Sequence, residues 1–214
     1  MAMDYQLKIL LLWGLGICIV FGIIIYLGLR NLKKMTVANQ SLKLLDMKRL
    51  LPQGLLETSD SLIYGIYQNY SATKVGFIVR NSSDQDIGEI NYKTGHRTGW
   101  LEITCMGESY EASTLNTWSS HTVVLHKVGD AKLQVCVFRR HFFRVTYDIP
   151  GIGVLESKTL GFLRDLYNLK RSYILGNRII GFVFIPQNSQ YSPRIVGLRV
   201  PIPLESQMFM LAMG

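Results

Sequence analysis

The longest uncharged stretch of the chain lies near its start. Between Lys8 and Arg30 stand 21 residues, ILLLWGLGICIVFGIIIYLGL, without a charged side chain. A helix of this length measures about 31 Å, which matches the hydrocarbon thickness of a bilayer. A secretory signal peptide has a shorter apolar region before a cleavage site, whereas this stretch continues into basic residues. We therefore expect residues 9–29 to form a transmembrane helix, preceded by a short tail of residues 1–8.

From Tyr64 onward the pattern changes to short runs of β-branched and aromatic residues, separated by Gly, Asn, Ser and Asp. Such runs are typical of the strands of an all-β domain, assigned here to residues 61–214. About eleven short strands must close into a barrel or stack into a sandwich to bury their apolar sides. The predicted strands are Lys74 to Arg80, Ile87 to Tyr92, Trp100 to Cys105, Tyr110 to Ser113, Thr122 to His126, Lys132 to Phe138, Phe142 to Ile149, Gly153 to Ser157, Tyr173 to Leu175, Ile179 to Ile185 and Ile195 to Val200.

Three segments repeat one order of features: an aromatic residue, a short strand, a turn, and then an Ile-Gly pair. They are FIVRNSSDQDIGEI, FRVTYDIPGIGVL and YILGNRIIGFV. Each segment predicts a hairpin, with Gly88, Gly153 or Gly181 at the start of the return strand. A kink or a close backbone approach there needs a residue without Cβ. The alternative is a chance recurrence in a chain rich in Gly and Ile.

The end of the chain departs from this β pattern. After Pro201 and Pro203, the segment Leu204 to Met213 is rich in Met, Leu and Ala, which are good helix formers. A short helix that is apolar on nearly all sides must be buried.

A β domain built from Ile-Gly hairpins and closed by an apolar helix resembles the superfamily that joins tubby C-terminal domains, phospholipid scramblases and the plant LURP-one-related proteins. The resemblance covers about residues 60–214. It implies a closed barrel of twelve strands threaded by a hydrophobic C-terminal helix, here Leu204 to Met213. Tubby domains bind phosphoinositide headgroups through basic side chains on the barrel. Scramblases differ from this chain, because they carry an acidic calcium-binding stretch and a cysteine cluster, and their membrane segment is the C-terminal helix.

Positive charge follows the apolar stretch, with six basic residues and one acidic residue in positions 30–52. The positive-inside rule therefore places the rest of the chain in the cytoplasm. Rough helical spacing of apolar residues up to Pro52 predicts a basic amphipathic connector at residues 30–60. Its cations either fix the topology alone or also contact anionic lipid. The candidate lipid-binding residues of the connector are Arg30, Lys33, Lys34, Lys43, Lys48 and Arg49.

Two features favour a body outside the cytoplasm. Asn39, Asn69 and Asn81 begin Asn-x-Ser sequons, which can be glycosylated only in the lumen or outside the cell. Cys105 and Cys136 could form one disulfide there, although two buried free thiols in a cytosolic body are the favoured interpretation. The alternative function is therefore a membrane-anchored interaction or structural component with an extracellular or lumenal body.

Signatures of catalysis are missing from the sequence. The histidines and cysteines lack metal-ligand spacing, and neither a Gly-rich phosphate loop nor a G-x-S-x-G elbow occurs. We expect no enzyme activity, no cofactor and no metal site. The segment RRHFFR offers Arg139, Arg140 and Arg144 around a turn, with guanidinium groups for phosphate and aromatic rings for the bilayer edge. The alternative is a solvated hairpin tip with its Phe side chains in the core.

These features together predict a single-pass, membrane-anchored module that binds anionic, phosphoinositide-like headgroups. The pI near 9.4 would also suit nucleic acid, but much of the excess charge lies beside the anchor, where lipid is the nearer polyanion. Within the predicted span Gly14, Cys18 and Gly22 recur every four residues, a pattern that permits self-association of the helix. Membrane spans are also rich in Gly in general.

Overall fold

The computed structural model describes residues 13, 16–23, 26, 43, 49, 51, 59–69, 74–93, 98–117, 119–142, 144–159, 169–186 and 193–214. The chain divides into two compact units, Met1–Ala38 and Asn39–Gly214.

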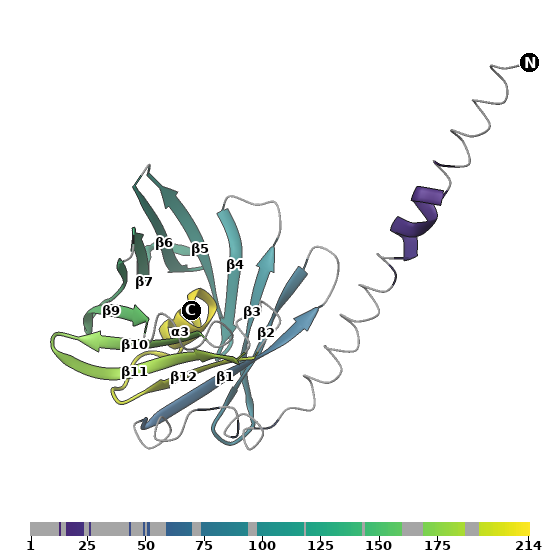
Figure 1. Ribbon diagram of the computed structural model, residues 1–214. Coiled ribbons are helices and arrows are strands. Elements are labelled where there is room, and N and C mark those ends of the chain that lie inside the picture. The colour runs from purple at the N-terminus through teal and green to yellow at the C-terminus, as the bar shows by residue number, and fades with distance from the viewer. Residues whose placement is uncertain are drawn as a thin grey trace, which may run out of the picture. The chain divides into compact units, whose positions relative to one another are not determined.

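The second unit is a closed antiparallel β-barrel of twelve strands within the described residues (Figure 1). Each strand pairs with the next one in the sequence, and β1 pairs with β12, so that the barrel has no free edge. This arrangement confirms the predicted all-β class and decides for a barrel over a sandwich. The strands are β1 Ser61–Asn69, β2 Lys74–Asn81, β3 Asp86–Lys93, β4 Thr98–Cys105, β5 Glu108–Asn116, β6 Ser120–Lys127, β7 Asp130–His141, β8 Arg144–Ile149, β9 Gly153–Thr159, β10 Leu169–Leu175, β11 Arg178–Ile185 and β12 Arg194–Leu198.

Helix α3, Leu204–Met213, lies inside the barrel, as the sequence predicts (yellow in Figure 1). Seven consecutive residues, 206–212, are buried. No side of this part of the helix faces solvent, which agrees with its nearly all-apolar sequence. Arg194 covers its C-terminal end: Nη1 donates hydrogen bonds to the carbonyl oxygens of Leu211, at 3.0 Å, and Ala212, at 2.6 Å. The Tyr92 hydroxyl donates to the same Ala212 oxygen at 2.9 Å. These bonds satisfy carbonyl groups that a helix end leaves without partners.

Strand β1 was not among the predicted strands. Its inward side chains Ile63 and Tyr67 belong to the main core, while Tyr64 and Ile66 are buried in a second cluster on the outer side of the barrel wall. Apolar residues on both sides remove the alternation by which a strand is recognised in a sequence. The eleven predicted strands all coincide, at least in part, with observed strands.

The outer cluster covers β1, β11 and β12. It contains Leu51 together with the outward side chains of these three strands, among them Phe182, Phe184 and Ile195. Leu51 belongs to the predicted connector and is only 8 % exposed. This part of the connector therefore packs on its own barrel.

The Ile-Gly pairs in β3 and β11 occupy the same structural position. Gly88 and Gly181 each lie opposite a residue of the preceding strand, and the register then shifts, so that Ile87 and Ile180 are the extra residues of two β-bulges. A Cβ on Gly88 would lie 2.4 Å from a carbonyl oxygen of β4, and one on Gly181 would lie 2.5 Å from a carbonyl oxygen of β12. The predicted close approach is confirmed at both positions.

The third pair differs. Ile152 lies in the β8–β9 turn, and Gly153 pairs with Ile149 where β9 begins. Gly153 has a φ of 113°, and a Cβ there would meet only ordinary contacts. Here Gly is required by the backbone conformation of the turn and not by a neighbouring strand.

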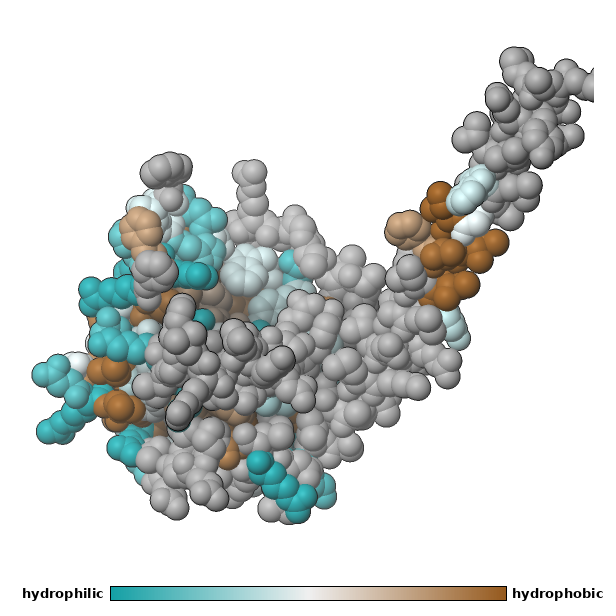
Figure 2. Space-filling view, in the orientation of Figure 1, coloured by the Kyte–Doolittle hydropathy of each residue, from teal (hydrophilic) through white to brown (hydrophobic). Residues whose placement is uncertain are grey.

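The first unit contains the predicted membrane span. The described positions 13, 16–23 and 26 are all helical, and Trp13, Phe21 and Tyr26 are each more than 60 % exposed. Figure 2 shows this described part as largely hydrophobic. Among the described residues, no helix reaches the length and apolarity that a membrane crossing requires. The remaining positions of 9–29 lie outside the described residues.

Two of the three small residues that were expected to allow self-association of this helix are described by the structure. Cys18 is exposed, and a Cβ on Gly22 would have no neighbour within 4 Å. Gly14 lies outside the described residues. The pattern therefore remains a prediction.

Candidate anion-binding site

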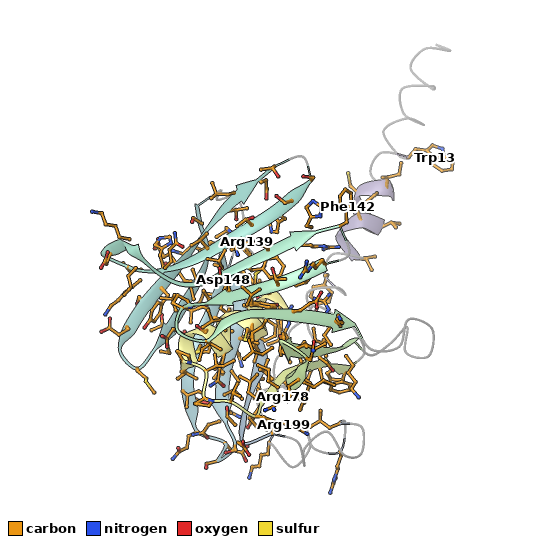
Figure 3. The ribbon with its side chains drawn as sticks, turned by 90° about the vertical axis from the view of Figure 1, so that its left-hand side faces the viewer. Trp13, Arg139, Phe142, Asp148, Arg178 and Arg199 are labelled. Carbon is orange, nitrogen blue, oxygen red and sulfur yellow. The ribbon has the colours of Figure 1, made fainter. Side chains whose placement is uncertain are left out.

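The RRHFFR segment forms the hairpin between β7 and β8. Strand β7 continues through His141, which pairs with Arg144 at the start of β8. Phe142 therefore lies in the turn, with a φ of 49° and an exposed fraction of 69 %. The prediction of a strand that begins at Phe142 was wrong at this residue, because Phe142 lies in the turn and β8 begins at Arg144. Figure 3 places Phe142 at the end of the barrel away from Arg178 and Arg199.

Strand alternation separates the three arginines that the sequence grouped. Arg139 points outward, and its Nη1 donates a hydrogen bond to Asp148 Oδ2 at 3.2 Å on the barrel wall (Figure 3). Arg144 also points outward, with its Nε 3.3 Å from Glu156 Oε1. Such exposed ion pairs contribute about 0–1 kcal/mol to stability. Their consequence here is that two of the three predicted cations already have carboxylate partners.

Arg140 lies on the other side of β7. It shares the inward side with Phe138, because side chains two residues apart in a strand point to the same face. There it borders a hollow of about 360 Å³ at the Phe142 end of the barrel. The residues that line the hollow are Phe138, Arg140, Phe142, Val145, Ser157, Arg171, Met213 and Gly214.

Arg171 is the second cation of this hollow, and the sequence analysis missed it. It lies in β10, two residues before the buried Tyr173, and so shares its inward side. The strand was predicted only from Tyr173 onward, so this alternation was not applied to Arg171. Among the described residues, neither Arg140 nor Arg171 has an ion-pair partner.

A buried hydroxyl group completes the polar lining. Ser157 is 6 % exposed, and its Oγ has no hydrogen-bond partner within the described part of the chain. Deeper in the barrel, the rings of Tyr147 and Tyr173 meet edge to face with centroids 5.6 Å apart. Burial raises the pKa of both phenols, and the positive charge of Arg171 opposes this rise.

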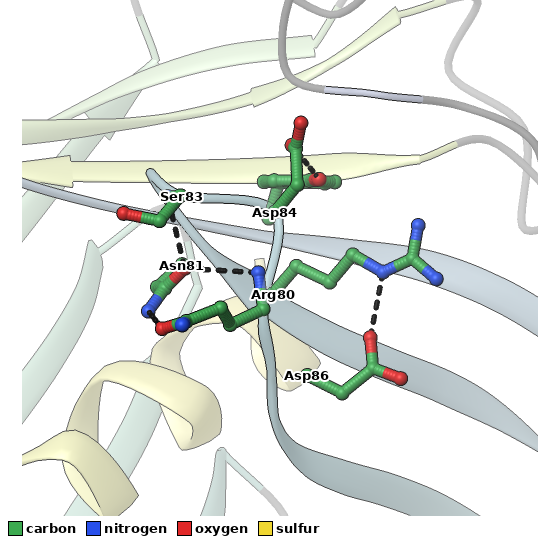
Figure 4. A network of polar contacts seen from close by, with 7 residues as sticks. Arg80, Asn81, Ser83, Asp84 and Asp86 are labelled. Atoms are coloured by element: carbon green, nitrogen blue, oxygen red, sulfur yellow. Dashed lines mark hydrogen bonds and ion pairs between the residues drawn. The ribbon is translucent and has the colours of Figure 1, made fainter.

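A polar network at the β2–β3 hairpin, at the other end of the barrel, is structural (Figure 4). Asn81 Oδ1 accepts hydrogen bonds from the backbone N–H groups of Ser83, at 2.9 Å, and Gln85, at 3.1 Å. The Tyr64 hydroxyl donates to Asp84, whose φ is 61°. Burial, together with the nearby Asp84 carboxylate, raises the pKa of Tyr64. These polar groups satisfy one another and hold the turn.

The two cysteines of the barrel are free and buried, so the expectation of free thiols is confirmed. Burial raises the pKa of Cys105 from 9.0 to about 11, and it raises that of Cys136 further. No group of three His, Cys, Asp or Glu side chains among the described residues could hold a metal ion.

We expect the barrel to lose stability in alkali. Unfolded thiols and phenols release protons above about pH 9 and pH 10. The folded chain keeps these protons to higher pH and so binds more of them, which lowers the free energy of unfolding by up to about 1.4 kcal/mol per pH unit and group. Urea midpoints at pH 8.0, 9.5 and 10.5 measure the fall, and a Cys105→Ala variant should show a shallower fall between pH 9 and 11. A midpoint independent of pH would contradict the assigned burial.

The connector cations are described only in part. Arg49 and Lys43 are exposed, whereas Arg30, Lys33, Lys34 and Lys48 lie outside the described residues. Their contact with lipid remains a prediction.

Comparison with known proteins adds no relative: no family model, no curated protein and no solved structure matches this chain.

Proposed function

We propose that this chain is a single-pass membrane protein whose cytoplasmic β-barrel binds anionic phospholipid headgroups and catalyses no reaction. The observation that carries the proposal is the pair Arg140 and Arg171, without carboxylate partners among the described residues, beside the exposed Phe142. Guanidinium groups bind phosphate through two parallel hydrogen bonds, and an exposed Phe ring can insert at the boundary between headgroups and acyl chains.

The tether is long enough for this arrangement. Neighbouring strands alternate in direction, so Ser61, where β1 begins, lies at the barrel end opposite Phe142. Leu51 packs on the barrel, which leaves residues 30–50 between the predicted span and the barrel, and a chain of this length reaches about 70 Å when fully extended. This length permits the Phe142 end to contact the membrane that holds the anchor.

The architecture also supports the proposed relation to the tubby, scramblase and LURP-one superfamily. That resemblance implies twelve strands around a hydrophobic C-terminal helix, and the barrel has twelve strands around α3. Phosphoinositides are the lipid class that the tubby members of the superfamily suggest for this chain.

The test uses the full chain in a nonionic detergent. We expect it to bind dioctanoyl phosphatidylinositol phosphate at least about tenfold more tightly than dioctanoyl phosphatidylcholine, a difference of about 1.4 kcal/mol, as measured by native mass spectrometry. Equal affinity for the two lipids would refute headgroup recognition.

A second candidate, the interaction component with a body outside the cytoplasm, is favoured by the sequon that begins at Asn81, the last residue of β2 before the hairpin turn. Expression in a eukaryotic host followed by glycosidase treatment separates the two. The proposed topology predicts no mass shift. Ser83→Ala is the matched variant, because it removes the sequon and leaves the hydrogen bonds of Asn81 to backbone N–H groups in place. A shift that this variant reduces would place the barrel on the lumenal side.

A further inference from the structure

We infer that the hollow between Arg140 and Arg171 is a binding site for a phosphate monoester group. The inference rests on the proposed function, because a phosphoinositide carries a phosphate monoester on its inositol ring. A free phosphate ester carries the same group. The experiment below separates these two sources.

Strand register brings the first two donors to one place. Arg140 pairs with Val145 across β7 and β8, and Val145 pairs with Ser157 across β8 and β9. These three inward positions form one row across adjacent strands. Because neighbouring strands lie about 4.8 Å apart, Arg140 and Ser157 stand about 10 Å apart at the backbone. A phosphate group between them lies within reach of both side chains.

Arg171 completes the set from the next strand. Ser157 pairs with Tyr173, and Arg171 lies two positions along β10, so it is a diagonal neighbour of Ser157 on the same face. The hollow is thus lined by Arg140 on β7 and Arg171 on β10, with Ser157 on β9 between them in the strand order. A tetrahedral dianion offers several acceptor oxygens, which suits three donor groups arranged in this way.

The charged side chains around the hollow favour an anion. The nearest carboxylates on β8 and β9, Asp148 and Glu156, are on the outer wall and are paired with Arg139 and Arg144. No Asp or Glu side chain lines the hollow among the described residues. Arg171 is half-buried and Arg140 is exposed at the mouth of the hollow. A half-buried charge is normally paired, so the Arg171 guanidinium in particular favours an anionic partner.

The C-terminal end of α3 is the competing partner, because Met213 and Gly214 form part of the same wall. Helix ends of this polarity attract cations. Arg194, however, already binds the carbonyl groups of Leu211 and Ala212, and the Gly214 N–H donates to the carbonyl oxygen of Met210 at 2.9 Å. The competing role for Arg140 and Arg171 is to stabilise the C-terminal end of α3 without binding a ligand. The experiment distinguishes this role from phosphate binding.

Ser157 gives the independent argument for a ligand. The residue is 6 % exposed and belongs to the lining of the hollow, and its hydroxyl oxygen is buried without a partner within the described chain. A buried polar group without a hydrogen bond costs about 1–3 kcal/mol, so such groups normally have a partner. An oxygen of a bound phosphate would accept the hydrogen bond of this hydroxyl.

Size and position limit what can enter. The volume of about 360 Å³ is near the lower end of the usual range of ligand pockets, about 300–1,000 Å³. A phosphorylated headgroup fits, whereas acyl chains would remain outside, beside the exposed Phe142. The same hollow would accept a small soluble phosphate ester.

The experiment titrates the full chain in nonionic detergent with glycerol 3-phosphate and, as a comparison, with acetate, using calorimetry at low ionic strength. Arg140→Gln and Arg171→Gln should each weaken glycerol 3-phosphate binding at least about tenfold, and Ser157→Ala should weaken it less. Arg139→Gln is the matched control, because it removes the neighbouring guanidinium of the same strand on its outer side; it should change affinity by less than about twofold. The melting temperature of each variant is recorded alongside.

A second arm repeats the measurement with dioctanoyl phosphatidylinositol phosphate and dioctanoyl phosphatidylcholine. If the phosphate ester binds through Arg140 and Arg171 but the anionic lipid has no advantage, the site stands and the lipid function fails. If the anionic lipid binds and Arg139→Gln weakens it as much as Arg140→Gln, the outer wall is the site and this inference is overturned. It is also overturned if glycerol 3-phosphate fails to bind, or if the inner variants only lower the melting temperature, as a role at the end of α3 predicts.

Discussion

Replacing Phe209 with alanine is expected to destabilise the barrel by about 3–5 kcal/mol. Phe209 lies in the buried part of α3 and has no exposed surface. Removal of the Phe209 ring leaves a cavity. The strands around it are held by hydrogen bonds in a closed barrel and cannot easily move inward to fill it. For a unit of this size, the loss corresponds to a fall in melting temperature of roughly 6–20 °C, measurable by circular dichroism on the full chain in detergent.

Phe142→Ala provides the control for this prediction. The chemical change is identical, but Phe142 is 69 % exposed in the β7–β8 turn. Its replacement should change stability by less than about 0.5 kcal/mol. The same variant should weaken binding to anionic lipid if Phe142 contacts the bilayer. Equal destabilisation by the two variants would contradict the burial of α3 inside the barrel.

Gly88→Ala is expected to destabilise the barrel by at least about 2 kcal/mol, because overpacking of a core costs about 1–3 kcal/mol even where side chains can move. The added Cβ would lie 2.4 Å from the carbonyl oxygen of Thr104 and 2.8 Å from Cε of Met208. The methionine side chain can move, but the carbonyl group belongs to the hydrogen-bonded strand β4. Strands β3 and β4 would have to separate, and the midpoint of urea unfolding should fall accordingly.

Two variants test this explanation. Gly151→Ala places a methyl group in open space at a φ of 79° in the β8–β9 turn, and should cost only the backbone penalty of about 1–2 kcal/mol. Adding Met208→Ala to Gly88→Ala should not restore stability, since the backbone contact persists. A rescue by this double variant would show that the side chain, and not the strand, is the obstacle.

The hollow at the Phe142 end is compatible with a stable barrel because it lies at one end of the core. The large buried side chains, such as Tyr147, Tyr173 and Phe209, fill the interior. Arg140 and Arg171 add polar groups only near the mouth, where a ligand or solvent can reach them. This separation allows substitutions at the mouth to be read as effects on binding, with the melting temperature as the check.

Local sequence patterns were sufficient for most of the barrel and for its helix. Short β-branched runs separated by turn residues indicated eleven of the twelve strands. Two prolines followed by an apolar helix-forming segment gave the observed bounds of α3. The Ile-Gly pairs at Gly88 and Gly181 indicated the two positions where neighbouring backbones approach closely. Strand propensity, helix propensity and the need for Gly depend mainly on residues close in the chain, so they can be read from the sequence.

Tertiary structure decided the composition of the site. Arg139, Arg140 and Arg144 are neighbours in the sequence, yet only Arg140 faces the hollow. Its partners there, Ser157 and Arg171, come from strands β9 and β10. Strand β1 could not be recognised in the sequence for a similar reason. The outer cluster around Leu51 buries its outward side, so this side is apolar and the alternation of apolar and polar residues is lost. The inward or outward direction of a side chain depends on barrel register and on what covers each wall, and both arise from contacts between residues far apart in the sequence.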